Sequence, residues 1–380
     1  MSSSPTPPAS ARTHDDRGLL GLLRSVPDPR HRRGVRHDLS VILGVGLSAV
    51  LAGCCSFAAI GEWAAALPPT ALARLGARAA PTESTIRRAF ARLDPEVLDC
   101  VLGAWIRTRS TTIGGRRVIA IDGKTVRGAR TRTDVAPHLV AVLDHGNGTV
   151  VGQLAVAAKS NEIPAVRTLL ATFDLVNTVV TLDAMHTQHD TARFVVDSGG
   201  DYVLTVKANQ PRLRAALKAL PWQDVPAHST VQRGHGRRAR RTLKVVTCPE
   251  WVDFPGAAQV AQLRRTVTRA GATSVEVVYL ITSAEHHDAP PATLAAWVQG
   301  HWRIENQLHW VRDVTYDWGH LPPAGADRSQ VRTGHAPQVM ATLRNTAISL
   351  LRLTGWTAIA TALRHHARDP NRPLNLILTC

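Results

Sequence analysis

Residues 118–127 read VIAIDGKTVR, and the rest of the chain is best interpreted from this stretch. Val118, Ile119 and Ile121 are β-branched, so the stretch begins as a strand buried on both faces. Asp122 follows at or near the carboxyl end of that strand, where open α/β sheets place their ligands. A carboxylate this close to a sheet core is costly unless a cation compensates it. The stretch therefore predicts an α/β sheet with a functional acid at its edge.

Two further acids extend this pattern. Residues 176–184, VNTVVTLDA, form another β-branched run, which ends in Asp183. Glu305 lies much later, on a helix that we expect over residues 292–314. It falls inside or at the edge of an apolar stripe, and glutamate is seldom buried unpaired. The stripe has helical spacing and consists of Leu294, Trp297, Val298, His301, Ile304, Leu308 and Val311. The alternative for Glu305 is an edge position paired with Arg303 or Arg312.

Three carboxylates without a clustered Cys or His set suit a hard cation, Mg²⁺ or Mn²⁺. Two such ions can serve phosphoryl transfer. We therefore predict that Asp122, Asp183 and Glu305 are catalytic and hold two metal ions. His186 and His189 follow Asp183 and leave a His-containing metal site open, although supporting and helix-start roles are favoured.

The charge balance points to a polyanionic partner. The chain has 380 residues with 45 Lys and Arg against 29 Asp and Glu, which gives a net charge of +16. Such an excess favours nucleic-acid binding, and the alternative is solubility or a coding bias toward Arg. The five Cys include no C-x-x-C pair, so neither a disulfide framework nor a thiolate zinc site is expected. This composition fits a reducing cytoplasm.

The first third of the chain is expected to be helical. Residues 1–16 are rich in Ser and Pro and predict a disordered tail without the apolar segment of a signal peptide. Residues 39–61 carry no charge and by length could span a bilayer. Gly and Ser dilute this segment, and residues 53–56 instead predict a break between two buried helices. We place a helical domain at residues 17–112.

Residues 113–380 are expected to form a mixed α/β sheet of ribonuclease H type, although the pattern by itself is compatible with several α/β folds. Three strands separated by short turns precede strand–helix alternation. The expected strands are 117–121, 139–143, 150–157, 178–182 and 202–207, and the expected helices are 163–173 and 189–197. A mostly β insertion follows at about 211–290, with strands at 243–247, 259–267 and 275–281. Closing helices are expected within about 330–370.

Several polar side chains are candidates for DNA contacts. Arg87 and Arg88 lie on a short helix that Ser84 is expected to cap, and such a helix can enter a DNA groove or present a solvated basic face. Polar residues at the predicted sheet edge can bind phosphate or base, with ordinary loop polarity as the alternative. They are Lys124, Lys207, Asn209 and Gln210. Trp302 and Trp310 flank Glu305, where core packing is favoured over stacking on a base.

Longer motifs make the chain similar to a known family. They are IDGKTVRG (121–128), KSNEIPA (159–165), TLDAMHTQ (181–188), GGDYVLTVKANQP (199–211), GHWRIENQLHWVRDVTY (300–316) and RTGHAPQVMATLRN (332–345). The chain resembles bacterial insertion-sequence DDE transposases of the ISAs-one, or H-repeat-associated, type over about residues 18–376. PDPRHRRGVRH and SFAAIGEW resemble the associated domain that precedes the catalytic domain in this family.

The resemblance implies a ribonuclease H-like fold and a DDE triad at Asp122, Asp183 and Glu305. It implies binding to terminal inverted repeats, cleavage of the strand by water, and transfer by the freed 3′-hydroxyl. A DNA-bound dimer is expected by analogy. Related transposases carry a Tyr-Arg-Glu-Lys signature, of which only Arg312 keeps the chemistry here, so Arg312 is a further candidate DNA contact.

Two departures from the family pattern keep alternatives open. Ala239 stands where the H-G-R-x-E-x-R motif has Glu, and residues 317–327 differ from the usual continuation. We predict a cytoplasmic, Mg²⁺-dependent DNA transposase. The alternatives are a decayed or repurposed DNA-binding protein, and a nuclease that cuts without joining.

Overall fold

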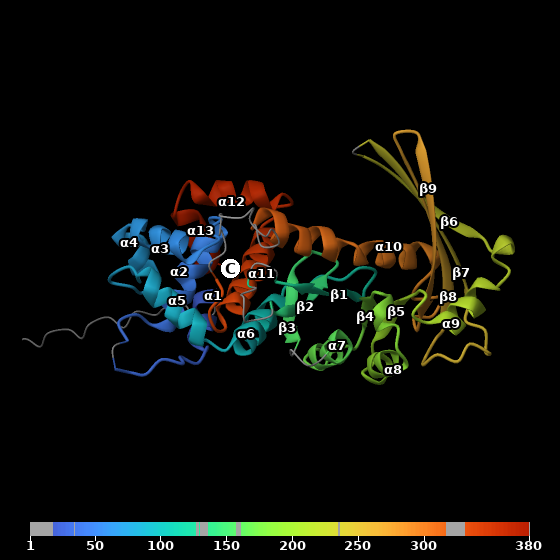
Figure 1. The fold of residues 1–380 in the computed structure, drawn as a ribbon, viewed down its shortest axis with the longest axis horizontal. Coiled ribbons are helices and arrows are strands. Elements are labelled where there is room, and N and C mark those ends of the chain that lie inside the picture. Colours follow the sequence, from blue (N-terminus) through green and yellow to red (C-terminus); the bar gives the residue numbers. More distant parts are fainter. Residues whose placement is uncertain are drawn as a thin grey trace, which may run out of the picture.

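The computed structural model describes residues 18–33, 35–126, 129, 136–156, 161–234, 236–316 and 331–379. The predicted N-terminal tail lies outside the described residues. Figure 1 shows a helical body, a central sheet and a curved β ribbon that continues the sheet away from the helical body. The fold therefore places helices at one end of the molecule and the basic insertion at the other.

The helical body is built from both ends of the chain. The N-terminal helices are α1 (Leu19–Arg24), α2 (Leu39–Leu51), α3 (Phe57–Ala66), α4 (Pro69–Arg74), α5 (Glu83–Arg92) and α6 (Pro95–Arg107). The C-terminal helices are α11 (Ala336–Leu353), α12 (Ile359–Ala367) and α13 (Asn371–Thr379). The helices α11 and α13 pack against α2, so the last fifty residues cover the first hundred.

The uncharged segment is explained by burial inside this body. Every residue of α2 is buried, because α1, α3, α5, α11 and α13 surround it. The helix ends at Leu51 and the next begins at Phe57, which confirms the predicted break. None of the helices in the described ranges has the length and apolar character needed to cross a membrane.

Local capping sets where the helices begin, and one expectation was wrong. The Thr82 side chain caps α5 by accepting a hydrogen bond from the Thr85 N–H. Ser84 therefore lies within the helix, two residues after the cap. Asp94 caps α6 in the same way by accepting from the N–H groups of Glu96 and Val97.

One nine-stranded sheet runs through the rest of the molecule in the order β3-β2-β1-β4-β5-β9-β8-β7-β6. Its first part comprises β1 (Arg117–Thr125), β2 (His138–Asp144), β3 (Val150–Val156), β4 (Thr178–Leu182) and β5 (Asp201–Val206). The strands β1, β2 and β3 are antiparallel, while β1, β4 and β5 are parallel. This order and these directions confirm the predicted ribonuclease H-like sheet.

The insertion extends the same sheet. It contains α9 (Pro211–Lys218), β6 (Ala227–Gly234), β7 (Arg237–Thr247), β8 (Gln259–Arg269) and β9 (Ala272–Thr282). All four strands are antiparallel, and β9 joins β5. The sequence interpretation missed α9 and β6. Most of β6 is exposed, so its residues lack the apolar alternation that identifies a half-buried strand.

Helices cover the two faces of the sheet differently. The helices α7 (Glu162–Leu170) and α8 (His189–Asp197) lie on one face (Figure 1). The helix α10 (Pro291–His301) packs on the other face, with Leu294, Trp297 and Val298 buried against Val118 and Val203. The chain after α10 is therefore directed along the sheet edge where the predicted acids lie.

The packing of α2 generates a stability prediction. A Cβ at Gly46 would lie 2.7 Å from Phe90 Cζ, whereas a Cβ at Gly44 would lie 3.3 Å from the flexible Leu75 Cδ2. Both replacements by Ala gain helix propensity. We expect Gly46→Ala to be less stable than Gly44→Ala by about 1–3 kcal/mol, measured by urea unfolding, because Phe90 is fully buried and has no room to move. Equal unfolding free energies would contradict this packing.

Candidate active site

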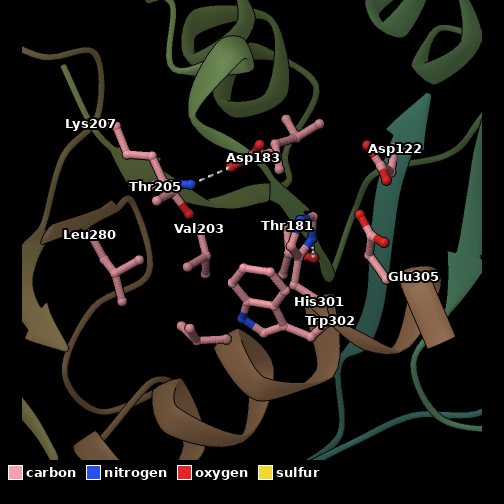
Figure 2. A pocket seen from close by; sticks show the side chains of 12 residues that line it. Asp122, Thr181, Asp183, Val203, Thr205, Lys207, Leu280, His301, Trp302 and Glu305 are labelled. Carbon is pink, nitrogen blue, oxygen red and sulfur yellow. Dashed lines mark hydrogen bonds and ion pairs between the residues drawn. The ribbon is translucent and has the colours of Figure 1, made fainter. Parts of the chain in front are cut away.

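The three predicted acids line one pocket of about 130 Å³. Asp122 comes from β1, Asp183 follows β4, and Glu305 follows α10. Figure 2 shows the Glu305 carboxylate directed toward Asp122, with Asp183 between Asp122 and Lys207 in this view. Three elements that are far apart in the sequence thus bring their carboxylates to one edge of the sheet.

Strand register explains why the two aspartates meet. The strands β1 and β4 are parallel, and Ile121 is the Cα partner of Leu182. The next residues of both strands, Asp122 and Asp183, therefore leave the sheet core at the same level. Asp122 is oriented further because its Oδ1 accepts a hydrogen bond from the Gly123 N–H at 2.9 Å.

Glu305 reaches the pocket through an unusual helical segment. The α-helix ends at His301, and two π-helical turns follow at Ile304–His309 and Val311–Thr315. The wider winding is seen where the Trp310 N–H donates to the Glu305 carbonyl oxygen. The predicted helix to residue 314 is therefore wrong in its winding, because its last part is not α-helical. Such π-helical insertions are frequent at functional sites.

The surroundings of Glu305 distinguish its two predicted roles. The apolar stripe is confirmed, since Ile304 and Leu308 are buried, while Glu305 itself is exposed at the pocket. Arg303 donates to the carbonyl oxygen of His145 at 2.9 Å. Glu305 makes no ion pair within the part of the chain that the structure describes, so the paired edge position is not what is observed.

Nitrogen-bearing side chains lie against the other two carboxylates. Lys207 Nζ is 3.6 Å from Asp183 Oδ1, and His309 Nε2 is 3.1 Å from Asp122 Oδ2. The Lys207 ammonium compensates part of the negative charge at the sheet edge. Among the described residues, no three His, Cys, Asp or Glu side chains already lie close enough together to hold a metal ion. The pocket therefore brings the three carboxylates near one another, but their oxygens are not yet within coordinating distance of a common position.

The predicted polar contacts at the sheet edge divide into two groups. Lys207 lines the pocket and is 42% exposed, so its ammonium can reach a bound phosphate. Lys124 instead pairs with Asp313 at 2.8 Å. The side-chain amides of Asn209 and Gln210 also point inward, as described next.

The two amides hold the segment that follows Asp183. Asn209 Nδ2 donates to the carbonyl oxygen of Ala184, and Gln210 Nε2 donates to that of Thr187. Both bonds fasten the 3₁₀ turn η2 (Ala184–His186) to the loop after β5. Each amide thus uses one of its two N–H groups on the protein backbone, and a DNA contact through the remaining groups stays a prediction.

Arg312 requires a correction. Its side chain is 0% exposed, so it presents no surface to DNA in this structure. Burial and the neighbouring Arg344 lower the pKa of Arg312 to about 9, while Asp313 and Asp99 act in the opposite direction. Arg87 and Arg88 differ from it, because both are exposed on α5, where Arg87 pairs with Glu83 at 3.0 Å.

The two tryptophans also differ from the favoured prediction. Trp302 is 48% exposed and Trp310 is 56% exposed, so neither is a core residue. Trp302 lines the pocket beside Glu305 (Figure 2). The stacking alternative is the one that this exposure favours, since a base can reach an open indole face.

A buried acid that the sequence interpretation did not use lies behind the pocket. The two carboxylate oxygens of Glu162 lie 2.7 Å from His138 Nε2 and 3.0 Å from His186 Nε2. Burial raises the pKa of Glu162, but the two histidine hydrogen bonds outweigh it and hold the pKa down at about 2. His189 starts α8 and contacts Phe254, so its predicted helix-start role is confirmed and neither His186 nor His189 lines the pocket.

Gly123 explains how this network fits beside Asp122. A Cβ at Gly123 would lie 2.3 Å from Glu162 Oε2 and 2.5 Å from His138 Nε2. The Gly of the IDGK motif therefore leaves room for the Glu162–His138 pair. In the sequence, only the KSNEIPA motif pointed to Glu162, and the sequence interpretation assigned this residue no role.

Two buried histidines support the pocket from below. Thr181 Oγ1 donates to the Ile119 carbonyl oxygen at 3.1 Å and lies 3.0 Å from His301 Nδ1 and 3.2 Å from His145 Nε2. Burial lowers the pKa of His145 to about 3 and also lowers that of His301. The His145 ring is therefore neutral at physiological pH. In the sequence, His301 and His309 stand four residues before and after Glu305, and this helical spacing was the sign that both could lie near it.

The Glu162 network predicts a pH dependence. Since folding holds the pKa of Glu162 at about 2 against a usual 4.5, its contribution to stability is present above about pH 4.5. It is lost as the pH falls toward 2. We expect Glu162→Gln to remove up to one proton from the pH slope of the unfolding free energy in that window, measured by urea unfolding. Asp190→Asn, at an exposed acid of α8, is the matched control, and an unchanged slope in Glu162→Gln would argue against the network.

Comparisons with known proteins agree with this geometry. Residues 113–335 match the family described as "Transposase DDE domain", and residues 20–106 match "DDE_Tnp_1-associated". "Putative transposase YncI" of Escherichia coli O157:H7 is 31% identical over 360 residues, covering 88% of this chain and 87% of that protein. "H repeat-associated putative transposase YhhI" of Escherichia coli strain K12 is 29% identical over 353 residues, covering 88% and 90%.

Among solved structures, the piggyBac transposase synaptic complex with hairpin DNA is similar with a TM-score of 0.43 and 10% identity, covering 94% of this chain and 80% of that one. The sequence comparisons match both parts of the chain, the helical N-terminal region and the sheet that carries the acidic pocket. The chain belongs to the DDE transposase family.

Proposed function

We propose that this chain is an insertion-sequence transposase that cuts DNA at terminal inverted repeats and joins the freed end to a target. The observation that carries the proposal is the meeting of Asp122, Asp183 and Glu305 in one pocket at the sheet edge. In the first step, water attacks a phosphodiester, which leaves a 3′-hydroxyl and a 5′-phosphate. In the second step, that 3′-hydroxyl attacks a target phosphodiester and displaces the target's own 3′-oxygen.

The chemistry of the three side chains fits a hard divalent cation. Asp122, Asp183 and Glu305 offer carboxylate oxygens and no thiolate, which is the donor set that Mg²⁺ and Mn²⁺ prefer. The ammonium of Lys207 already places a positive charge beside Asp183, and the ring of His309 lies against Asp122. When bound, such ions activate the attacking oxygen and stabilise the leaving one. We propose that these three residues hold two ions.

The chain's own residues would position the DNA. Lys207 supplies a point charge for a phosphate at the pocket. Trp302 offers an exposed ring on which an unpaired base can stack. Asn209 and Gln210 act indirectly, because they fasten the turn that follows Asp183. Since transposon ends are processed in pairs, we expect two chains to act together on DNA.

Loss of one carboxylate tests the catalytic proposal. We expect Asp183→Asn to cut a labelled inverted-repeat duplex in Mg²⁺ more than about 100-fold more slowly than the unaltered protein, because a metal ligand is removed. EDTA should stop cutting and Mn²⁺ should restore it. Asp190→Asn is the matched control, since it makes the same change on α8, where Asp190 pairs with Arg167 outside the pocket. Undiminished cutting by Asp183→Asn would exclude this pocket as the active site.

Adding target DNA to the same reaction separates the two enzymatic candidates. Joined products identify a transposase, whereas cutting without joining identifies a metal-dependent nuclease.

A DNA-binding protein without catalysis is the second candidate, which Ala239 favours. Ala239 is 2% exposed on β7, where Gln232 and Val267 are its Cα partners. Its small side chain fits this position, so it is no sign of a damaged fold. The altered segment 317–327 lies outside the described residues. Specific binding without cutting, by the unaltered protein and by Asp183→Asn alike, would identify this candidate.

The basic helix α5 generates a separate prediction about DNA binding. Arg87 and Arg88 are exposed on neighbouring positions of α5. We expect Arg87→Ala with Arg88→Ala to weaken binding to the inverted repeat. The slope of log K against log[salt] should become shallower by about 1.8, since each lost phosphate contact changes it by about 0.9. Fluorescence anisotropy over a salt series measures this slope. An unchanged slope would assign these residues to a solvated face.

A further inference from the structure

The β ribbon presents two chemically different faces. Side chains alternate along a strand, so even-numbered and odd-numbered residues of β7 point to opposite sides of the sheet. On the odd face, Leu243 of β7 and Leu263 of β8 pack toward α10 together with Val298 and Trp302. The even face points away from α10 and therefore away from the helix that lines the acidic pocket.

The even face carries a hollow of about 470 Å³, larger than the pocket that holds the three acids. Its lining comes only from alternate residues of β7 and β8. They are Arg238, Arg240, Thr242, Lys244, Gln262, Arg264, Thr266 and Thr268. Four of these side chains are cationic, three carry hydroxyl groups, and none is acidic. The lining therefore offers only positive charge and neutral hydrogen-bonding groups.

The strand register distributes these groups evenly. Arg238 faces Thr268, Arg240 faces Thr266, and Thr242 faces Arg264 across the β7–β8 pair. Like charges directly opposite each other would destabilise the sheet. Across the β7–β8 pair the alternation avoids this cost and places a hydroxyl beside each guanidinium, and both groups bind phosphate oxygens. Across the β6–β7 pair, Arg238 instead faces Arg233, which adds to the positive charge of the ribbon.

The arginines of this hollow are available to a ligand. Arg238, Arg240 and Arg264 are exposed, and none of them makes a hydrogen bond or ion pair with any residue in the described ranges. On the odd face, by contrast, Arg265 pairs with Glu276. Lys244 is the exception in the hollow, because its ammonium donates to the carbonyl oxygens of Trp222 and Gln223.

We infer that this hollow binds the sugar–phosphate backbone of duplex DNA outside the catalytic pocket. The inference rests on the proposed function and extends it, because it adds a second DNA contact on the opposite face of the sheet. Free guanidiniums and hydroxyls without a carboxylate match a polyanion. The hollow lies on the projecting ribbon in Figure 1, where a duplex can approach without entering the acidic pocket.

The test compares DNA binding by charge-neutral variants. Arg240→Gln with Arg264→Gln removes two central cations, and Arg364→Gln with Arg368→Gln removes two from the exposed surface of α12 and its end. Binding to a fluorescein-labelled duplex, which carries the inverted repeat and flanking DNA, is followed by anisotropy in EDTA over a KCl series. We expect the salt slope to fall by about 1.8 in the ribbon variant, at about 0.9 per lost contact, and to keep its full value in the α12 control.

A second pair of substitutions tests the face of the ribbon. Arg237 and Arg269 are Cα partners on the odd face of the same two strands. Arg237→Gln with Arg269→Gln should leave the slope near the value of the unaltered protein. An equal fall in all three variants would mean general electrostatics, and no fall in the ribbon variant would overturn the inference. A ribbon variant that changes its oligomeric state, measured by sedimentation, without a change in DNA binding would also overturn the inference.

The design keeps this inference separate from the proposed catalysis. Binding is measured in EDTA, so it does not depend on a metal or on cutting. If the unaltered protein fails to cut in Mg²⁺ while the ribbon variant loses its slope, the catalytic proposal fails and the DNA contact stands. If the unaltered protein cuts DNA and the ribbon variant keeps its full salt slope, the catalytic proposal stands and the DNA contact of the hollow fails.

Discussion

The packing of α10 across the sheet is the constraint on which the site depends. Leu294, Trp297 and Val298 are buried against residues of both the central strands and the ribbon, so the helix has one stable position. Its extension by π-helical turns then brings Glu305 to the sheet edge that already carries Asp122 and Asp183. A shift of α10 by one residue would rotate Glu305 by about 100° away from the pocket.

Charge compensation around the acids is shared between the two sides of the sheet edge. Lys207 and His309 face Asp183 and Asp122 from within or beside the pocket, while Glu162 with its two histidines lies behind Gly123. The arrangement keeps unpaired charge out of the core and leaves the carboxylate oxygens on the open side. The basic hollow of the ribbon lies on the face of the same sheet that points away from this acidic site.

Much of the fold could be predicted because its signals are local. β-branched runs end in Asp122 and Asp183, and strand β4 and helix α8 were placed with their observed bounds. The interpretation of β6 failed because this strand is largely exposed and carries no apolar alternation. The helix α9 was missed although Leu213, Leu217 and Leu220 have helical spacing, because it is short and mostly exposed. The three acids could be singled out because a carboxylate beside an apolar run is unusual wherever it occurs.

The sequence by itself indicated a mixed sheet of ribonuclease H type, most of its strands and the three acids at its edge. Only the tertiary structure decided that Arg312 is buried, that Trp302 is open to solvent, and that Glu162 pairs with His138 and His186. The physical reason is one of range. Strand and helix formation depends on neighbours within a few residues, whereas the exposure and pairing of a side chain depend on elements that are distant in the sequence.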